Sequence, residues 1–168
     1  MTLRVVLVGL PGVGKTTVGE ALALELAVAF VDLDDAVSSR CGEPPASLLR
    51  SRGEAAFRAL ETDALGSVLA RDEGFVLATG GGTVESEAAR ALLNAEPLVV
   101  QLVAPTPSLL ERLGGADRPL LEDPSAESLA ALGARRGAWY AEVADATVDA
   151  SGPVDAVVDA VARLAVRA

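Results

Sequence analysis

The chain has 168 residues, of which 51% are apolar and only 3% are aromatic, and its formal net charge is −10. This length fits one domain with a full hydrophobic core. The negative charge argues against a surface that binds nucleic acid or an anionic membrane, and no apolar run approaches the ~20 residues of a membrane span. Because the chain has no histidine, histidine-based acid–base chemistry and histidine metal sites are excluded.

Cys41 is the only cysteine, so an internal disulfide is impossible. A reducing compartment fits this composition, and the N-terminal apolar run lacks the layout of a signal peptide. We therefore expect a cytoplasmic protein in which Cys41 is an inert small side chain. We also expect a monomer, because the sequence shows no apolar surface stripe.

Short apolar runs alternate with helical patterns along the chain. Strands are predicted at 3–9, 29–34, 75–79, 97–103 and 145–150, and helices at 16–27, 54–71, 126–143 and from 154 onward. This alternation predicts an α/β fold of three layers, in which a five-stranded parallel sheet has helices on both faces. Ligands of such sheets bind beyond the C-terminal ends of the strands.

The stretch GLPGVGKTT, residues 9–17, follows the first predicted strand and opens the first predicted helix. That context is typical of a P-loop, in which backbone N–H groups and a helix N-terminus hold phosphate. Lys15, the only lysine, is expected to reach the β- and γ-phosphates of ATP, and the Thr16 hydroxyl is expected to bind Mg²⁺. The predicted ATP-binding residues of this loop are Gly12, Val13, Gly14, Lys15, Thr16 and Thr17.

A P-loop occurs both in nucleotide-dependent switches and in small-molecule kinases, so it does not name a function alone. GTPases read guanine with an Asn-Lys-x-Asp element. This chain has one asparagine, Asn94, and its single lysine already belongs to the P-loop. The switch is therefore disfavoured, and a kinase additionally requires an acceptor pocket and a lid.

Asp32 and Asp34 are predicted at the end of the second strand, where residues two apart share a face. Asp32 is expected to hold Mg²⁺ through water. Asp34 is expected to accept a proton from a substrate hydroxyl or to orient that hydroxyl. The alternative is a helix N-cap, with Asp34 or Asp35 starting the next helix, and we favour that role for Asp35.

Two further features belong to the predicted acceptor side. Arg58 and Glu61 are three residues apart on a predicted helix and can pair, although a solvated surface pair is the alternative. The triple glycine Gly80–Gly82 follows the third predicted strand. It exposes backbone N–H groups and allows a ligand to approach closely, so we favour a functional turn over a plain connection.

Arg136 falls on the apolar stripe of the predicted helix 126–143, four residues from both Leu132 and Tyr140. An inward-facing arginine must find an anion or reach water, whereas Arg135 is expected to be solvated. The segment around Arg118 is rich in glycine, proline and charge, which is typical of a mobile lid. Closure of this lid would bring Arg118 to the transferring phosphoryl group.

Six pieces of the sequence, in their order and spacing, resemble those of shikimate kinases: GLPGVGKTT, DLD, GEAAFR..E, GGG, RPLL and RRGAWY.EVA. The resemblance covers the whole chain. It implies one domain, residues 1–168, with a nucleoside-monophosphate-kinase-like P-loop fold and a lid at about 112–124. It also implies that MgATP phosphorylates the 3-hydroxyl of shikimate, in the pathway to chorismate and the aromatic amino acids.

The resemblance also implies roles for single residues. Shikimate would be held by Asp34, Arg58, Gly80, Gly81, Gly82 and Arg136, with both arginines on its carboxylate. Lys15, Asp34 and Arg118 would act in catalysis, Arg112 and Arg118 would join the ATP site, and Thr16 and Asp32 would hold the metal. The alternatives are a gluconate-type or nucleotide kinase of the same fold, and a homologue that binds ATP without transferring phosphate.

Overall fold

The computed structural model describes residues 2–114 and 125–168. Five parallel strands form one sheet in the order β2-β3-β1-β4-β5. The strands are β1 (Arg4–Val8), β2 (Ala29–Asp32), β3 (Phe75–Ala78), β4 (Val99–Val103) and β5 (Ala146–Asp149). The predicted five-stranded parallel sheet is confirmed, with strand ends that differ from the predicted ones by a few residues.

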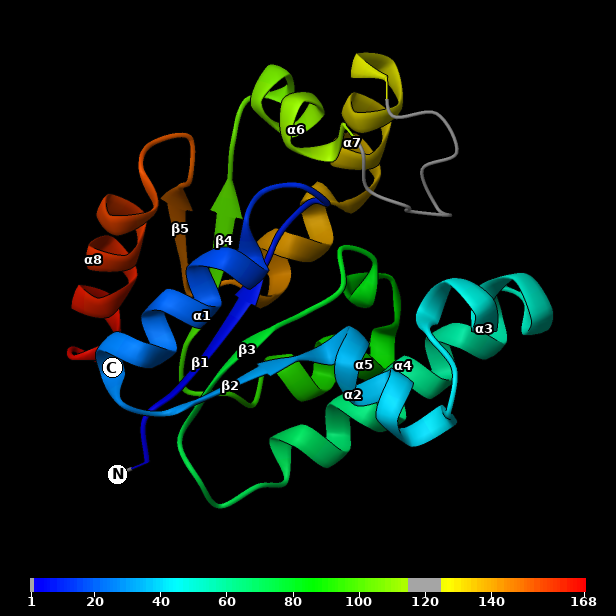
Figure 1. The fold of residues 1–168 in the computed structure, drawn as a ribbon, viewed down its shortest axis with the longest axis horizontal. Helices are drawn as coiled ribbons and strands as arrows, with labels where there is room; N and C mark the ends of the chain where they lie inside the picture. The colour runs from blue at the N-terminus through cyan, green and yellow to red at the C-terminus, as the bar shows by residue number, and fades with distance from the viewer. Residues whose placement is uncertain (1, 115–124) are drawn as a thin grey trace.

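Helices cover both faces of this sheet and complete the three predicted layers. Figure 1 shows α1 and α8 on one face, and α4, α5 and α7 on the other. The helices are α1 (Lys15–Leu26), α2 (Leu33–Cys41), α3 (Pro45–Arg52), α4 (Glu54–Leu69), α5 (Glu87–Leu93), α6 (Thr106–Leu113), α7 (Ala126–Val143) and α8 (Val154–Ala165), with a 3₁₀ helix η1 (Thr83–Glu85). Because β3 and η1 are joined by the triple glycine, η1 lies at the C-terminal edge of the sheet.

The alternation of side chains along the central strand β1 divides the hydrophobic core in two. Val5 and Leu7 pack into the layer with α1 and α8, whereas Val6 and Val8 pack into the layer with α4, α5 and α7. All four side chains are fully buried. A strand buried on both faces reads as a continuous apolar run, which is why β1 was predictable from its sequence.

Strand β2 ends at Asp32, two residues earlier than predicted. The Asp32 side chain accepts a hydrogen bond of 2.9 Å from the backbone N–H of Asp34 and caps α2. Such a cap satisfies a donor that the first helical turn leaves unpaired, so the chain turns into a helix directly after Asp32. Asp34 and Asp35 therefore both lie in the first turn of α2. The prediction that Asp34 shares a strand face with Asp32 is wrong, and so is the prediction that Asp35 caps the helix, because the cap is Asp32.

Helix length and polarity also bear on the membrane prediction. Within residues 2–114 and 125–168, no helix combines the length and the apolar character needed to cross a membrane. Cys41 closes α2 as a half-buried side chain packed against the core layer of α4.

Candidate active site

The P-loop connects β1 to α1 at the C-terminal edge of the sheet. Gly9, Gly12 and Gly14 have φ angles of 148°, 80° and 103°, which residues other than glycine rarely adopt. Space is limiting as well, because a Cβ atom on Gly9 would lie 2.5 Å from the carbonyl oxygen of Leu102. Gly14 is the N-cap of α1 and makes no side-chain cap, so the first N–H groups of α1 face the loop.

Lys15 and Thr16 open α1 and point into this loop region. The Lys15 side chain is buried, and its ammonium donates to the carbonyl oxygens of Gly9 at 2.7 Å and Leu10 at 3.1 Å. The Thr16 hydroxyl donates to Asp32 at 2.9 Å. The sheet topology thus places the end of β2 beside the start of α1, as the predicted pairing of Thr16 with Asp32 requires.

A hollow of about 260 Å³ joins the phosphate side to the acceptor side. It is lined by Gly12, Gly14, Lys15, Thr16, Thr17, Asp32, Asp34, Thr79, Gly80, Gly81 and Arg112. Most of the predicted ATP-binding residues are therefore brought together with Asp34, although Asp34 reaches the hollow from a helix rather than from a strand.

Arg112, in the last turn of α6, closes one side of this hollow. Its guanidinium donates to the carbonyl oxygens of Val13 at 3.0 Å and Ala150 at 2.9 Å. It therefore connects the P-loop to the end of β5. Arg118 and most of the predicted lid lie outside the described residues, which reach only the beginning of that segment, through Gly114.

Arg58 lies on α4 and is bound by a buried acid. Its NH1 group donates at 2.8 Å to Glu61, whose residue is only 1% exposed, and Glu61 also accepts from the Thr83 hydroxyl at 2.8 Å. The predicted pair is confirmed, and the alternative of a solvated surface pair is wrong. Among the described residues, the buried Nε and NH2 groups of Arg58 have no hydrogen-bond acceptor.

The triple glycine lies against this pair. A Cβ atom on Gly80 would lie 2.5 Å from Glu61, one on Gly81 would lie 2.9 Å from Pro11, and one on Gly82 would collide with the guanidinium of Arg58. None of these three glycines has a positive φ angle. Their lack of a Cβ atom is thus required by the close approach of other parts of the protein, and the predicted approach of a ligand stays a prediction.

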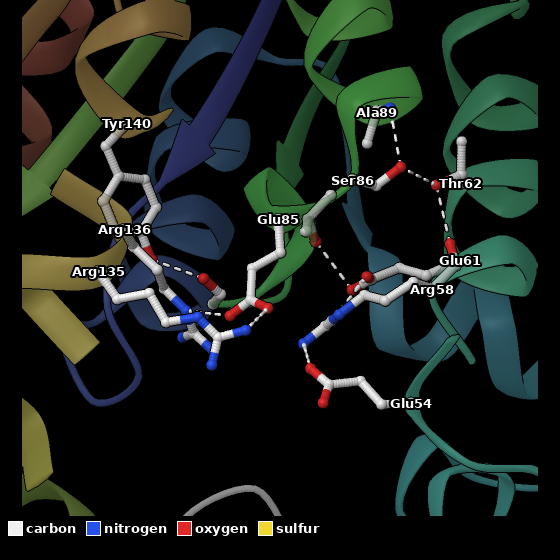
Figure 2. Close-up of polar contacts among 12 residues, drawn as sticks. Glu54, Arg58, Glu61, Thr62, Glu85, Ser86, Ala89, Arg135, Arg136 and Tyr140 are labelled. Atoms are coloured by element: carbon white, nitrogen blue, oxygen red, sulfur yellow. Dashed lines mark hydrogen bonds and ion pairs between the residues drawn. The ribbon is translucent and has the colours of Figure 1, made fainter. Parts of the chain in front are cut away.

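Arg136 lies on α7, and its residue is 3% exposed. Its Nε group donates to Glu85 at 2.8 Å, and the NH2 group of Arg135 donates to the other oxygen of Glu85 at 2.7 Å. Figure 2 shows Glu85 between Arg58 on one side and Arg136 on the other. The buried stripe prediction for Arg136 is confirmed, and Arg135 is more than half exposed, with 57% of its side chain accessible.

Tyr140 connects Arg136 to the glycine turn, because its hydroxyl donates to the carbonyl oxygen of Gly81 at 2.6 Å. Burial raises the pKa of Tyr140 to about 12, while the charge and hydrogen bonding of Arg136 act in the opposite direction. The phenol therefore stays neutral and keeps its donor at physiological pH.

Glu85, Arg90 and the polar role of Tyr140 were not predicted from the sequence. Arg90 on α5 donates to the carbonyl oxygen of Val84 at 2.8 Å and so fixes the backbone next to Glu85. Glu85 belongs to a 3₁₀ helix of three residues, too short for a hydrophobic period, so no pattern pointed to it. For Tyr140, its place four residues after Arg136 on one stripe was a usable signal.

The residues present suit Mg²⁺ better than a metal held by the protein alone. Within the described part of the chain, no three acids or cysteines gather into a metal-binding group. Mg²⁺ in kinases instead takes one or two protein oxygens and completes its shell with water and phosphate. The hydroxyl of Thr16 and the carboxylate of Asp32, which are 2.9 Å apart, fit that requirement.

A P-loop at the C-terminal edge of a parallel sheet with strand order 2-3-1-4-5, beside an acid, the buried Arg136 and the mostly buried Arg58, defines a small-molecule kinase of the P-loop class. A family model described as shikimate kinase matches residues 11–165. The shikimate kinase of Salinispora arenicola is 45% identical over 163 residues, covering 95% of this chain and 96% of that protein. The shikimate kinase of Halorhodospira halophila is 43% identical over 152 residues, covering 89% and 85%. The chain belongs to the shikimate kinase family.

Solved structures agree with this assignment. Shikimate kinase from Acinetobacter baumannii, solved in complex with shikimate, has a TM-score of 0.93 and 32% identity over 99% of this chain and 94% of that chain. A gluconokinase from Sinorhizobium meliloti has a TM-score of 0.68 at 23% identity over 99% and 94% of the two chains, which shows a shared fold alone. The comparisons therefore give no support to the gluconate alternative beyond the fold.

Proposed function

We propose that this shikimate kinase transfers the γ-phosphoryl group of ATP to the 3-hydroxyl of shikimate, which gives shikimate 3-phosphate and ADP. The observation that supports this proposal best is a pair of arginines on the acceptor side, of which Arg136 is buried and Arg58 is mostly buried. Among the described residues, Nε and NH2 of Arg58 make no hydrogen bond, NH2 has only a longer ion pair of 3.7 Å with Glu54, and Arg136 lies across from Arg58. Such donors favour an acceptor molecule that brings a carboxylate.

Arg58 and Arg136 would hold that carboxylate, and the Gly80–Gly82 turn would let the ring approach the backbone. Glu61 occupies NH1 of Arg58, and Glu85 occupies Nε of Arg136. Each arginine therefore meets the acceptor in an orientation that the protein has already fixed. Orientation of this kind lowers the entropic part of the barrier to transfer.

The phosphate side would act through charge and backbone donors. The P-loop N–H groups, with Gly12 to Thr17, would hold the phosphates, and Lys15 would move from its present carbonyl partners to the transferring group. Arg112 would border the nucleotide from the side of Ala150. Arg118, outside the described residues, is proposed to add a second positive charge to the transition state.

In the proposed step, the acceptor hydroxyl oxygen bonds to the γ-phosphorus while the bond from that phosphorus to the β,γ-bridging oxygen breaks. Asp34 would orient the hydroxyl and take its proton, and the electron pair of the broken bond stays on ADP. Thr16 and Asp32 would hold Mg²⁺, which when bound neutralises charge on the phosphate oxygens.

The predicted monomer also remains a proposal. Among the residues that the structure describes, Leu24, Val154 and Val166 are the large apolar side chains left exposed. A few exposed apolar side chains are common on monomeric proteins. Sedimentation of the purified protein would reveal a stable dimer directly.

The experiment is a comparison of ADP release from MgATP with shikimate, gluconate, AMP or no acceptor, in parallel. Release that shikimate alone accelerates is the expected result. Release that gluconate or AMP accelerates instead would overturn the acceptor while keeping the P-loop chemistry. ATP binding without accelerated release in any tube would favour the non-catalytic alternative.

A further inference from the structure

We infer that Glu85 is a positioning residue that presents Arg136 to the carboxylate of the acceptor. This inference rests on the proposed function, because it assigns a role within the proposed acceptor site. Glu85 differs from Glu61, its counterpart for Arg58, in that it comes from the 3₁₀ helix η1 and not from the helix that carries the arginine.

The contact geometry indicates that Glu85 stays bound to Arg136 when the acceptor binds. Glu85 binds Arg136 through Nε at 2.8 Å, which is compatible with an end-on contact between the two terminal amino groups and a carboxylate. Its second oxygen accepts from Arg135 at 2.7 Å, and only 8% of its side chain is exposed. A buried carboxylate that satisfies both oxygens would lose both bonds if it moved away.

The backbone of Glu85 is fixed as firmly as its side chain. The N–H of Glu85 donates to the carbonyl oxygen of Gly82 at 3.0 Å, and Arg90 donates to the adjacent carbonyl of Val84 at 2.8 Å. Arg90 is itself bound by Glu142 on α7 at 2.9 Å. The backbone beside Glu85 is therefore fixed by Arg90 on α5, which is in turn bound to α7.

The same three-residue helix supports both arginines. Thr83, its first residue, donates to Glu61 at 2.8 Å, and Glu61 holds Arg58. Glu85, its last residue, holds Arg136 (Figure 2). Because η1 follows the glycine turn directly, one short segment sets the spacing between the two guanidinium groups and the turn against which the acceptor would lie.

A competing role gives the opposite sign. If Glu85 occupied Arg136 in place of the acceptor carboxylate, removing Glu85 would strengthen acceptor binding. If Glu85 positions Arg136, removing it releases the guanidinium and weakens acceptor binding. The direction of the change in acceptor KM therefore decides between the two roles.

The test uses Glu85→Ala and the isosteric Glu85→Gln, with Glu87→Gln as the matched control because Glu87 is an exposed acid two residues away. We measure kcat and both KM values, with shikimate and with its neutral methyl ester as acceptors. For Glu85→Ala we expect the KM for shikimate to rise about tenfold to a hundredfold, the size of one lost charge-assisted hydrogen bond. The KM for ATP should change by less than about twofold, and the preference for the acid over the ester should shrink.

Glu85→Gln should show the same pattern more weakly, and it keeps the inference testable if Glu85→Ala does not fold. A lower KM for shikimate, an unchanged one, or equal rises in both KM values would overturn the positioning role. A substrate-free arm separates this inference from the proposed function. We expect the Nε–H of Arg136, which is buried and bound to Glu85, to exchange slowly with solvent, and its signal is identified by its loss in Arg136→Lys. This signal should lose protection in Glu85→Ala and keep it in Glu87→Gln. Wild-type inactivity on shikimate would refute the proposed function, whereas retained protection in Glu85→Ala would refute the positioning role.

Discussion

The phosphate side and the acceptor side of the site are built in opposite ways. The phosphate side comes from one continuous stretch, in which glycines with positive φ angles wrap Lys15 and the first turn of α1. The two arginines of the acceptor side are held by side chains from three separate segments, α4, η1 and α7. A site made of backbone groups depends on residues that are neighbours in the sequence. A site made of ion pairs depends on residues that are distant in the sequence and that only the fold brings together.

The largest expected effect falls on the phosphate side. Lys15→Met should reduce kcat by a factor on the order of a thousand or more, because it removes a preorganised charge from the transferring group. Lys15→Arg should fail similarly, since the buried space between the carbonyls of Gly9 and Leu10 holds a compact ammonium. Single-turnover assays with each variant measure the loss, and circular dichroism confirms the fold. Substantial turnover by Lys15→Arg would contradict this account of the only lysine.

On the acceptor side the loss should appear as affinity. Arg136→Ala should weaken acceptor binding by about 2–5 kcal/mol, the usual cost of truncating one partner of a buried charge pair, while ATP binding survives. Calorimetric titration with each substrate separates the two effects. Arg163→Ala, an exposed arginine on α8 across the sheet, is the control and should bind both substrates normally. Unchanged affinity in Arg136→Ala would refute its assignment.

A smaller effect is expected from crowding the glycine turn. Gly82→Ala places a methyl group against the guanidinium of Arg58, which must move away from its aligned position. We expect the KM for the acceptor to rise about tenfold, as for one misplaced charge-assisted hydrogen bond, with the KM for ATP nearly unchanged. Gly152→Ala is the control, because nothing lies within 4 Å of a Cβ atom there. If both variants behaved alike, the close approach at Gly82 would have no functional meaning.

The buried phenol of Tyr140 makes the acceptor side sensitive to alkaline pH. Its pKa is raised to about 12, so the folded state keeps a proton that the unfolded state loses above its ordinary value of 10.0. Stability from this group is therefore complete below about pH 10 and is lost as the pH rises through about 12, by an amount on the order of 2 kcal/mol.

Tyr140 is the only tyrosine, so its ionisation can be followed directly by the absorbance of tyrosinate. Unfolding by urea at a series of alkaline pH values gives the accompanying loss of stability. Tyr140→Phe should remove that part of the pH dependence. A tyrosinate midpoint near the ordinary value in the folded protein would show that burial does not protect this group.

The smallest expected effect tests a region away from both sides. Ala27 ends α1 in a left-handed conformation, with φ 53° and ψ 42°. This conformation is energetically unfavourable for a residue with a Cβ atom. Ala27→Gly should stabilise the protein by about 0.5–1 kcal/mol and leave activity unchanged. Ala70→Gly is the control, because Ala70 ends α4 in a right-handed conformation and should lose stability. Thermal unfolding of both variants measures the pair, and a lower melting temperature for Ala27→Gly would contradict the strain.

How much the sequence could predict follows the same division. Buried parallel strands and the P-loop were predictable because their signals are local, and the α7 stripe placed Arg136 correctly because it spans a long helix. The position of Asp34 was not, because the cap that Asp32 makes ends β2 two residues early and gives way to a helix. Glu85 left no signal, because a carboxylate that binds arginines about fifty residues away has no period of its own.

The acceptor side and the phosphate side differ in intrinsic fluorescence, because the chain has a single tryptophan and a single tyrosine. Trp139, the only tryptophan, lies on α7 next to the only tyrosine, and the guanidinium of Arg90 lies over its ring at 5.4 Å from the centroid. Arg90 also holds the backbone beside Glu85. The native emission of this protein thus originates at the acceptor side, and the P-loop is optically silent. The tryptophan emission of the unlabelled protein should therefore respond to rearrangement at η1. Addition of ATP alone is the control, because ATP is expected to bind away from Trp139.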